Sequence, residues 1–320
     1  MDIAAYAAKA AAANPMPLVN VPSPTEGLVA HVDGDFCAYN CAGSDDTDPG
    51  QARRNLISKL DSIKFASGAT AVVVHLTDRA STKGERYLAA TVKPYQGQRN
   101  SGRKPKNWEV LREYMETYDG DKFRVKNWMT READDGIAYV THHAAQAGKL
   151  SVICTADKDM RMLPGRHVIW KTKQLVEVPF GTYDLTGPDD ETYGHKWFWL
   201  QMLMGDTADF IPGLPKYITP AGKEAQVGKA TAYKLLAGTE NNAEAYAIVS
   251  GLYRGYYDED WADRFVEQAT LLWLRTDRFA GMLDFMTIIP FAKSIEGACE
   301  RLCDRVATAR AEAEAILCGD

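Results

Sequence analysis

Three short apolar runs constrain the fold of this chain more than any other feature. They are LVAHV (28–32), AVVVHL (71–76) and LSVIC (150–154), and helical patterns lie between them near 50–66 and 131–147. Their length and β-branched content are typical of buried strands. Strands that alternate with helices predict an α/β fold with a largely parallel sheet covered on both faces. A further pair of strands is expected within VIWKTKQLVEV (168–178).

With 320 residues, the chain is long enough for one large domain or two ordinary ones. Residues 1–26 are Ala-rich and then interrupted by prolines, which predicts an N-terminal extension. From about Trp197 the pattern is helical, with a Gly/Pro-rich turn region before amphipathic helices. We therefore expect an α/β domain over 27–190 and a helical region over 191–320.

Composition indicates a soluble globular protein, since 46 % of the residues are hydrophobic and can form a substantial core. The chain does not open on a basic segment, and no uncharged apolar run reaches the roughly 18 residues of a membrane span, so we expect neither a secretion signal nor a membrane helix. Cys37/Cys41 and Cys299/Cys303 have the i, i+4 spacing that suits a metal. Buried free thiols in a reducing cytoplasm are the favoured interpretation.

Acidic residues follow each of the three predicted strands. Asp33 follows the first strand, Asp78 the second, and Asp157 and Asp159 the third. Because the carboxyl ends of parallel strands meet at one edge of a sheet, four acids are expected to converge there.

The stretch MTREADDG places Glu132, Asp134 and Asp135 at the start of a predicted helix. Thr130 is the expected N-cap, and the helix dipole favours acids in the first turn. Asp134 and Asp135 would project about 100° apart, so capping accounts for only one or two of the three acids.

GDTADF adds Asp206 and Asp209, whose spacing predicts that they share one side of a helical turn. Nine carboxylates at element ends repel one another unless cations neutralise them. Oxygen ligands favour Mg²⁺ or Mn²⁺ over zinc, and because Mg²⁺ takes only one or two carboxylates directly, nine acids suit two ions. Two metals about 4 Å apart would clamp the attacking and leaving oxygens of a phosphodiester displacement. A structural or solvated role remains the alternative for any single acid.

The formal net charge is −6, yet the segment from Arg79 to Arg131 carries thirteen Lys/Arg against six Asp/Glu. Its stretch KPYQGQRNSGRKPKNW (93–108) mixes basic residues with an aromatic ring, as expected where single-stranded nucleic acid is bound. Tyr95 is expected to stack on a base and Arg99 to hold the scissile phosphate. The alternatives are a solvated loop and a core tyrosine. Further phosphate contacts are expected from Arg103, Lys104 and Lys106.

The stretch IPGLPKYITPAGKEAQVGKATAYKLLAG carries glycines and lysines before an amphipathic helix. Backbone N–H groups at such turns bind phosphates without reading bases. We expect Gly213 and Gly228 to grip duplex DNA here, reinforced by Lys223 and Lys229.

Taken in order, HVDGDF, HLTD, PYQGQR, READD, TADKDM and GDTADFIPG resemble the flap endonuclease and 5′-nuclease superfamily, especially the 5′-to-3′ exonucleases of tailed bacteriophages. The resemblance covers roughly residues 28–240. It implies a PIN-like mixed sheet between helices, an arch over about 80–130, and a helix-three-turn-helix that holds duplex DNA, often with K⁺. In two places the chain departs from this pattern. Gln96 stands where phage relatives commonly carry a lysine, with Lys93 as the expected substitute, and YITPAGKEAQ is inserted in the hairpin.

The resemblance divides the nine acids into two groups of metal ligands. The second-metal cluster is Asp135, Asp206 and Asp209. The inner and shared ligands are Asp33, Asp78, Glu132, Asp134, Asp157 and Asp159.

The activity implied is that of a divalent-metal-dependent 5′-to-3′ exodeoxyribonuclease with 5′-flap endonuclease activity, which leaves a 5′-phosphate and a 3′-hydroxyl. The implied partner is DNA with a free 5′ end or flap, with RNA–DNA hybrids as a further substrate, in the host cytoplasm if the chain is phage-encoded. One alternative is a phosphatase of the haloacid dehalogenase class with Asp33 as covalent nucleophile. A non-catalytic DNA-binding module and a PIN-type ribonuclease are the others.

Overall fold

The computed structural model describes residues 22–98, 102–219 and 221–318, so most of the expected N-terminal extension lies outside the described residues. One six-stranded sheet with the order β3-β2-β1-β4-β5-β6 forms the centre of the fold. All neighbouring strands are parallel except β6, which runs antiparallel to β5, so the predicted mixed, mainly parallel sheet is confirmed. The strands are β1 (Thr25–Asp33), β2 (Ala69–Thr77), β3 (Arg124–Trp128), β4 (Ser151–Cys154), β5 (Gly165–Val168) and β6 (Leu175–Val178).

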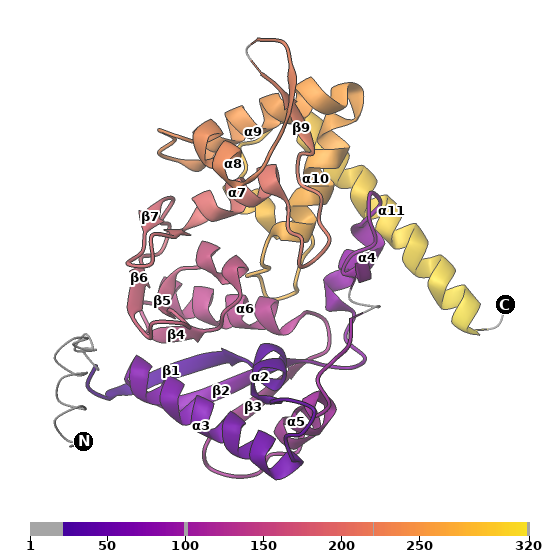
Figure 1. Cartoon of the computed structure of the whole chain (residues 1–320). Helices are drawn as coiled ribbons and strands as arrows, with labels where there is room; N and C mark the ends of the chain where they lie inside the picture. The colour runs from indigo at the N-terminus through magenta and orange to yellow at the C-terminus, as the bar shows by residue number, and fades with distance from the viewer. Residues whose placement is uncertain (1–21, 99–101, 220, 319–320) are drawn as a thin grey trace.

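Helices cover both faces of this sheet (Figure 1). Alternate residues of β1, among them Ala30 and Val32, pack on one face against α2 (Gly34–Cys41), α3 (Pro49–Ser67) and α5 (Trp108–Glu116). The other face is covered by α6 (Ala133–Gln146), whose inner side chains join a second core. Period-two burial in the strand follows from the alternation of side chains along a pleated backbone.

The second core continues from α6 and β4 into the C-terminal helices, so sheet and helical region share buried contacts. The expected domain boundary near residue 190 therefore stays a prediction. The inserted YITPAGKEAQ forms an antiparallel hairpin of β9 (Lys216–Ile218) and β10 (Glu224–Gln226), which projects at the top of Figure 1. The helices of this C-terminal region are α7 (His195–Met204), α8 (Lys229–Leu235), α9 (Asn242–Tyr257), α10 (Trp261–Leu272) and α11 (Lys293–Cys318).

The C-terminal helix α11 packs beside the short helix α4 (Arg86–Ala89), and its last turns extend away from the body (Figure 1). Arg310 of α11 forms an ion pair with Glu85, and Arg305 donates to the carbonyl of Ala89 at 2.8 Å. The segment before and within α4 is thus held by the end of the chain. Within the described residues, no helix is both long and apolar enough to cross a membrane.

One strand was not among those expected, and one expected helix cap is wrong. Strand β3 was not foreseen, because it is an edge strand whose residues are mostly exposed and lack the apolar pattern of a buried strand. Glu132, and not Thr130, is the N-cap residue of α6, and it makes no side-chain cap hydrogen bond. The Thr130 carbonyl instead accepts from the Gly84 N–H at 3.0 Å.

Gly136 allows α6 to lie close against the edge of the sheet. The indole of Trp128, at the end of β3, is fixed because its Nε1–H donates to His75 Nδ1 at 3.0 Å. A Cβ atom added at Gly136 would overlap this indole. Close approach of the helix therefore requires a residue without a side chain here.

We predict that Gly136→Ala lowers the free energy of unfolding by about 1–3 kcal/mol, because overpacking outweighs the better helix propensity of alanine. Gly251→Ala is the matched control, since a Cβ at this position in α9 meets nothing within 4 Å. The control should be neutral or stabilising by up to about 1 kcal/mol. Urea unfolding curves of both variants test this, and equal effects of the two substitutions would contradict it.

Candidate metal centre

The carboxyl ends of the two central strands bring Asp33 and Asp157 together. Asp33 ends β1 and caps α2, accepting the Phe36 N–H at 3.0 Å. Asp157 follows β4 and accepts the Asp159 N–H at 2.9 Å. Burial, reinforced by repulsion from Asp157, raises the pKa of Asp33 to about 7, and burial raises the pKa of Asp157 as well. Neither carboxylate forms an ion pair with a described basic residue.

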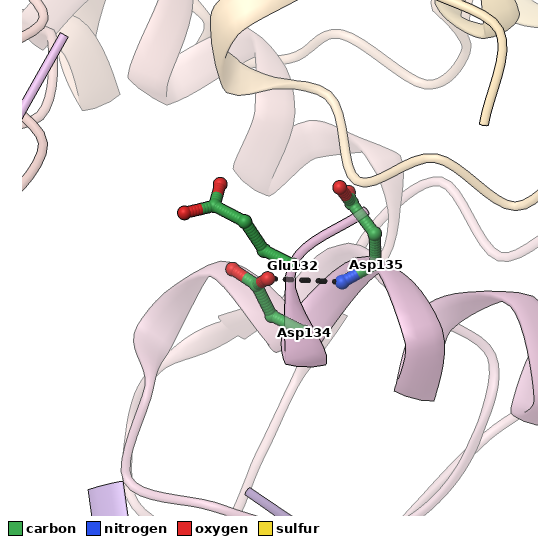
Figure 2. A group of neighbouring side chains, drawn as sticks. All are labelled: Glu132, Asp134 and Asp135. Atoms are coloured by element: carbon green, nitrogen blue, oxygen red, sulfur yellow. Dashed lines mark hydrogen bonds between the residues drawn. The ribbon is translucent and has the colours of Figure 1, made fainter. Parts of the chain in front are cut away.

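The three acids at the start of α6 do not all point the same way. One carboxylate oxygen from each of Glu132, Asp134 and Asp135 lies within 4.8 Å of the others. Figure 2 shows Glu132 and Asp134 on one side of the helix start and Asp135 on the other, with the Asp135 N–H donating to Asp134 Oδ1 at 3.0 Å. Burial, followed by repulsion from Glu132 and Asp135, raises the pKa of Asp134 well above its usual value.

Asp135 is held in a buried ion pair with Arg86 of α4. The guanidinium makes two contacts with the carboxylate, at 2.6 and 2.8 Å, and a third with Glu132 at 3.2 Å. Burial opposes the charge of Asp135, but the Arg86 guanidinium and the Arg275 N–H lower its pKa below the usual value. Arg86 also donates to the carbonyls of Leu271 and Trp273. The Asp135 carboxylate therefore already has a full set of partners.

Asp206 and Asp209 lie in a turn after α7, so the expected helical placement is wrong. The turn is closed because the N–H and C=O of Asp206 pair with those of Ile211, at 2.8 and 2.7 Å. Lys158 forms ion pairs with Asp206 and, at 3.2 Å, with Asp159. Burial of Asp206 is outweighed by Lys158, which lowers the pKa of this carboxyl.

The pKa of Asp159 is shifted in the opposite direction to that of Asp206, although both carboxylates contact Lys158. Gln201 also donates to Asp159 Oδ1 at 2.6 Å. Burial and repulsion from Asp157 nevertheless raise the pKa of Asp159 well above its usual value.

Tyr95 and Gln96 from the basic segment contact two of the acids. The Tyr95 hydroxyl lies 2.8 Å from Glu132 Oε2 and 3.1 Å from Asp209 Oδ2. The Gln96 side chain donates to the other oxygens of the same two carboxylates, at 3.0 and 3.2 Å, and its backbone N–H donates to the Asp209 carbonyl at 3.0 Å. These contacts join the segment after α4 to both α6 and the turn after α7.

Asp78 follows β2, the strand next to β1 in the sheet. It lies at the end of β2, is partly exposed, and accepts the Ala80 N–H at 2.9 Å. Within the described residues, no hydrogen bond joins its side chain to the other eight acids. Its ligand role stays a prediction.

The residues present fit a hard divalent cation. Arg86 and Lys158 supply the positive charge beside Asp135 and Asp206 and lower the pKa of these two carboxyls. Five other carboxyls of the site have raised pKa values, with burial as the largest cause; they are Asp33, Glu132, Asp134, Asp157 and Asp159. Of these five, Glu132 contacts Arg86 and Asp159 contacts Lys158, while Asp33, Asp134 and Asp157 form no ion pair with a described basic residue. A set of carboxylate oxygens without histidine or cysteine suits Mg²⁺ or Mn²⁺.

The other basic residues expected at the site have partners elsewhere. The Lys93 ammonium lies 4.7 Å from the ring centroid of Phe210, and Arg99 falls outside the described residues. Three further side chains contact the loop before α3 or the start of α5. Arg103 pairs with Asp45, Lys106 donates to the Asp45 carbonyl, and Lys104 lies over the Trp108 ring.

The hairpin residues are spread over two connections. The Gly213 N–H donates to Gln268 Oε1 at 2.9 Å, and Gly228 is the N-cap residue of α8. Lys229 pairs with Glu191 at 3.2 Å, and Lys223 is exposed on the β9–β10 hairpin. Their DNA-binding role stays a prediction.

Sequence reasoning missed Arg86, Lys158 and Gln201. Lys158 stands inside the TADKDM motif, where a cation between two aspartates is visible in the sequence. Arg86 and Gln201 carry no local pattern, because their acidic partners lie 49 and 42 positions away along the chain.

No protein-family model matches this sequence, and no curated protein is detectably similar to it. Solved structures from bacteriophage T5 do match. A T5 protein co-crystallised with metal ions is 15 % identical, with a TM-score of 0.53 over 87 % of this chain and 99 % of that one. The T5 flap endonuclease in a complex with DNA and metal ions is 15 % identical, with a TM-score of 0.52 over 88 % and 99 %.

The chain has the fold of these 5′ nucleases. A T5 5′-exonuclease with bound zinc ions matches equally well, at 15 % identity and a TM-score of 0.53 over 87 % and 99 %. The match confirms, for the fold, the resemblance indicated by the ordered acidic motifs. The 5′-nuclease fold places the carboxyl ends of β1 and β4 beside the start of α6, which is where the acids gather.

We predict that Arg86→Met lowers the free energy of unfolding by about 3–5 kcal/mol, because it leaves the buried Asp135 carboxylate without its cation. Arg301→Met is the control. Arg301 also contacts an aspartate, Asp263, through two nitrogens, but its side chain is 58 % exposed. An exposed pair should contribute less than about 1 kcal/mol. Comparable costs for the two variants in urea unfolding would contradict the expectation.

We also predict that Asp134→Asn affects thermal stability differently with and without a divalent metal. In EDTA the variant should be at least as stable as wild type, because it removes a buried carboxyl repelled by Glu132 and Asp135. Mn²⁺ should stabilise wild type, by about 2.7 kcal/mol at one hundred times Kd, and should stabilise the variant less. Thermal melts test this, with the exposed Asp61→Asn on α3 as control. An equal Mn²⁺ shift in wild type and Asp134→Asn would contradict it.

Proposed function

We propose that this chain is a divalent-metal-dependent 5′ nuclease that hydrolyses DNA near a free 5′ end or 5′ flap, leaving a 5′-phosphate and a 3′-hydroxyl. The observation that carries the proposal is the group of carboxylates at the ends of β1 and β4 and at the start of α6, where one oxygen each of Glu132, Asp134 and Asp135 lie within 4.8 Å of one another. Tyr95 and Gln96 of the basic segment lie against this group. The shared fold with T5 flap endonuclease supports the same conclusion.

Two Mg²⁺ or Mn²⁺ ions would be held by the acids. Bound divalent cations supply positive charge to the phosphate and lower the pKa of an attacking water. The first ion would take oxygens from Asp33, Asp134 and Glu132, and the second from Asp157, Asp159 and the turn carrying Asp206 and Asp209. Asp135 would act in the surrounding shell, because it is already paired with Arg86. Asp78 follows β2, which neighbours β1 in the sheet, and would be a further ligand or belong to that shell.

Tyr95, Gln96 and Lys158 hold the carboxylates of the site in place. The Tyr95 hydroxyl and the Gln96 amide each contact one oxygen of Glu132 and one of Asp209, so they fix the distance between the two carboxylates. Lys158 holds the Asp206 and Asp159 carboxylates close together. Such fixed ligands limit the reorganisation needed during reaction.

DNA is the proposed partner, with RNA–DNA hybrids as a second substrate. Of the arch expected over about 80–130, α5 and β3 belong to the sheet and its covering layer, so the segment between α4 and α5 would hold the single strand through Arg99 and the basic residues 103–106. The region around α8 would hold the duplex through Gly213, Gly228 and the nearby lysines, with K⁺ as a further ligand. Backbone and phosphate contacts of this kind carry little base specificity. Base identity should therefore matter little.

A phosphatase with Asp33 as covalent nucleophile fits the geometry less well. A phosphatase of this class needs one divalent cation, which leaves the cluster of Glu132, Asp134 and Asp135 and its contacts with Tyr95 and Gln96 without a role. Asp33 also accepts the Phe36 N–H as a helix cap. A DNA-binding module without catalysis would place uncompensated carboxylates beside phosphates, which repels them.

The test is cleavage of 5′-labelled DNA carrying a 5′ flap, beside blunt duplex and single strand, in Mg²⁺, Mn²⁺ or EDTA. We expect metal-dependent cleavage on the 5′ side of the duplexes. Asp134→Asn should reduce the rate about a hundredfold or more, as expected for loss of transition-state charge stabilisation, and the exposed Asp61→Asn should retain it. If wild type cleaves none of these DNAs with either metal, the proposed function is wrong.

A further inference from the structure

We propose that Lys83 is a catalytic residue that brings positive charge to the scissile phosphate, with Gln96 as the residue that positions it. This inference rests on the proposed nuclease function. It replaces the expectation that Lys93 takes this part, because the Lys93 ammonium lies over the Phe210 ring.

The Lys83 ammonium reaches the edge of the acidic group through Gln96. It donates to Gln96 Oε1 at 3.3 Å, and the Nε2 of the same amide donates to Glu132 and Asp209. The ammonium is therefore one amide group away from two candidate metal ligands. A neutral glutamine cannot supply positive charge itself, but its oxygen can hold a cation beside the site.

Lys83 differs from the other lysines around the site in its partners. Lys158 is already paired with Asp206 and Asp159. Within the described part of the chain, no carboxylate lies within ion-pair distance of the Lys83 ammonium. Because an ammonium has three donors and one is directed at Gln96, the others can bind phosphate oxygens.

The backbone fixes Lys83 in an uncommon conformation. Lys83, Gly84 and Glu85 are three successive left-handed residues, with φ of 50°, 62° and 60°. Left-handed conformations are costly for residues other than glycine and persist only where the surroundings hold them. Two backbone hydrogen bonds do so here, from Thr82 N–H to the Met129 carbonyl at 2.9 Å and from Gly84 N–H to the Thr130 carbonyl at 3.0 Å.

These hydrogen bonds tie Lys83 to the segment that leads directly into Glu132. The lysine and the acid are therefore fixed to the same piece of backbone. A cation held in this way stabilises negative charge that develops on phosphate oxygens without reorganisation during the reaction.

The experiment measures single-turnover cleavage of 5′-flap DNA in Mg²⁺, and DNA affinity in Ca²⁺. Lys83→Met should slow cleavage about a hundredfold or more while DNA affinity changes less than about threefold, because the charge acts mainly in the transition state. Lys83→Arg should retain more activity than Lys83→Met. Lys149→Met is the control, since Lys149 is exposed before β4, at the opposite end of that strand from Asp157.

A thermal melt separates lost charge from lost folding, because Lys83→Met should unfold together with wild type while it cleaves more slowly. Cleavage by Lys83→Met within threefold of wild type, or equal rates for Lys83→Arg and Lys83→Met, would overturn the assignment. A wild-type protein without any metal-dependent cleavage would instead refute the underlying nuclease proposal.

Discussion

The buried ion pair between Arg86 and Asp135 connects three parts of the molecule. Asp135 belongs to α6 on the sheet and Arg86 belongs to α4. The Arg86 guanidinium also donates to the carbonyls of Leu271 and Trp273 at the end of α10, through Nε and Nη2. A buried carboxylate without its cation is unfavourable, so these three segments must meet in one arrangement. The positions of Glu132 and of the strained turn at Lys83 follow from it, because both lie within three residues of one partner.

The electrostatics of the site divide the acids by what stands next to them. At Asp135 and Asp206 the neighbouring basic side chain outweighs burial and lowers the pKa of the carboxyl. At Glu132 and Asp159 burial outweighs the contact with the same basic side chains, and the pKa is raised. Where only other carboxyls are present, as at Asp134, burial and repulsion raise the pKa. The first kind supports the fold, while the second kind stores unfavourable free energy that a bound cation would relieve. One cluster thus contains both structural and ligand-binding acids, although all share the same residue types.

The sequence predicted the sheet and its acidic edge because these depend on local patterns. Strands β1, β2 and β4 are apolar runs, and each is followed by an aspartate at the edge where parallel strands end. Strand β3 was missed because an exposed edge strand needs few apolar residues. The contacts of Arg86 and Lys83 were missed for another reason. They join residues far apart in sequence, or depend on positive φ at residues other than glycine, and neither leaves a periodic signature.

The contact between α11 and the base of the arch also determines when the site can be completed during synthesis. Arg305 and Arg310 bind Ala89 and Glu85, which are made more than two hundred residues earlier. On a ribosome, the sheet and its aspartates can form well before these partners emerge. The segment from Glu85 to Ala89 then lacks the support of α11, although the turn at Lys83 is already bonded to Met129 and Thr130. A nascent chain therefore carries the acids and the side chains that contact them before it carries the helix that supports α4.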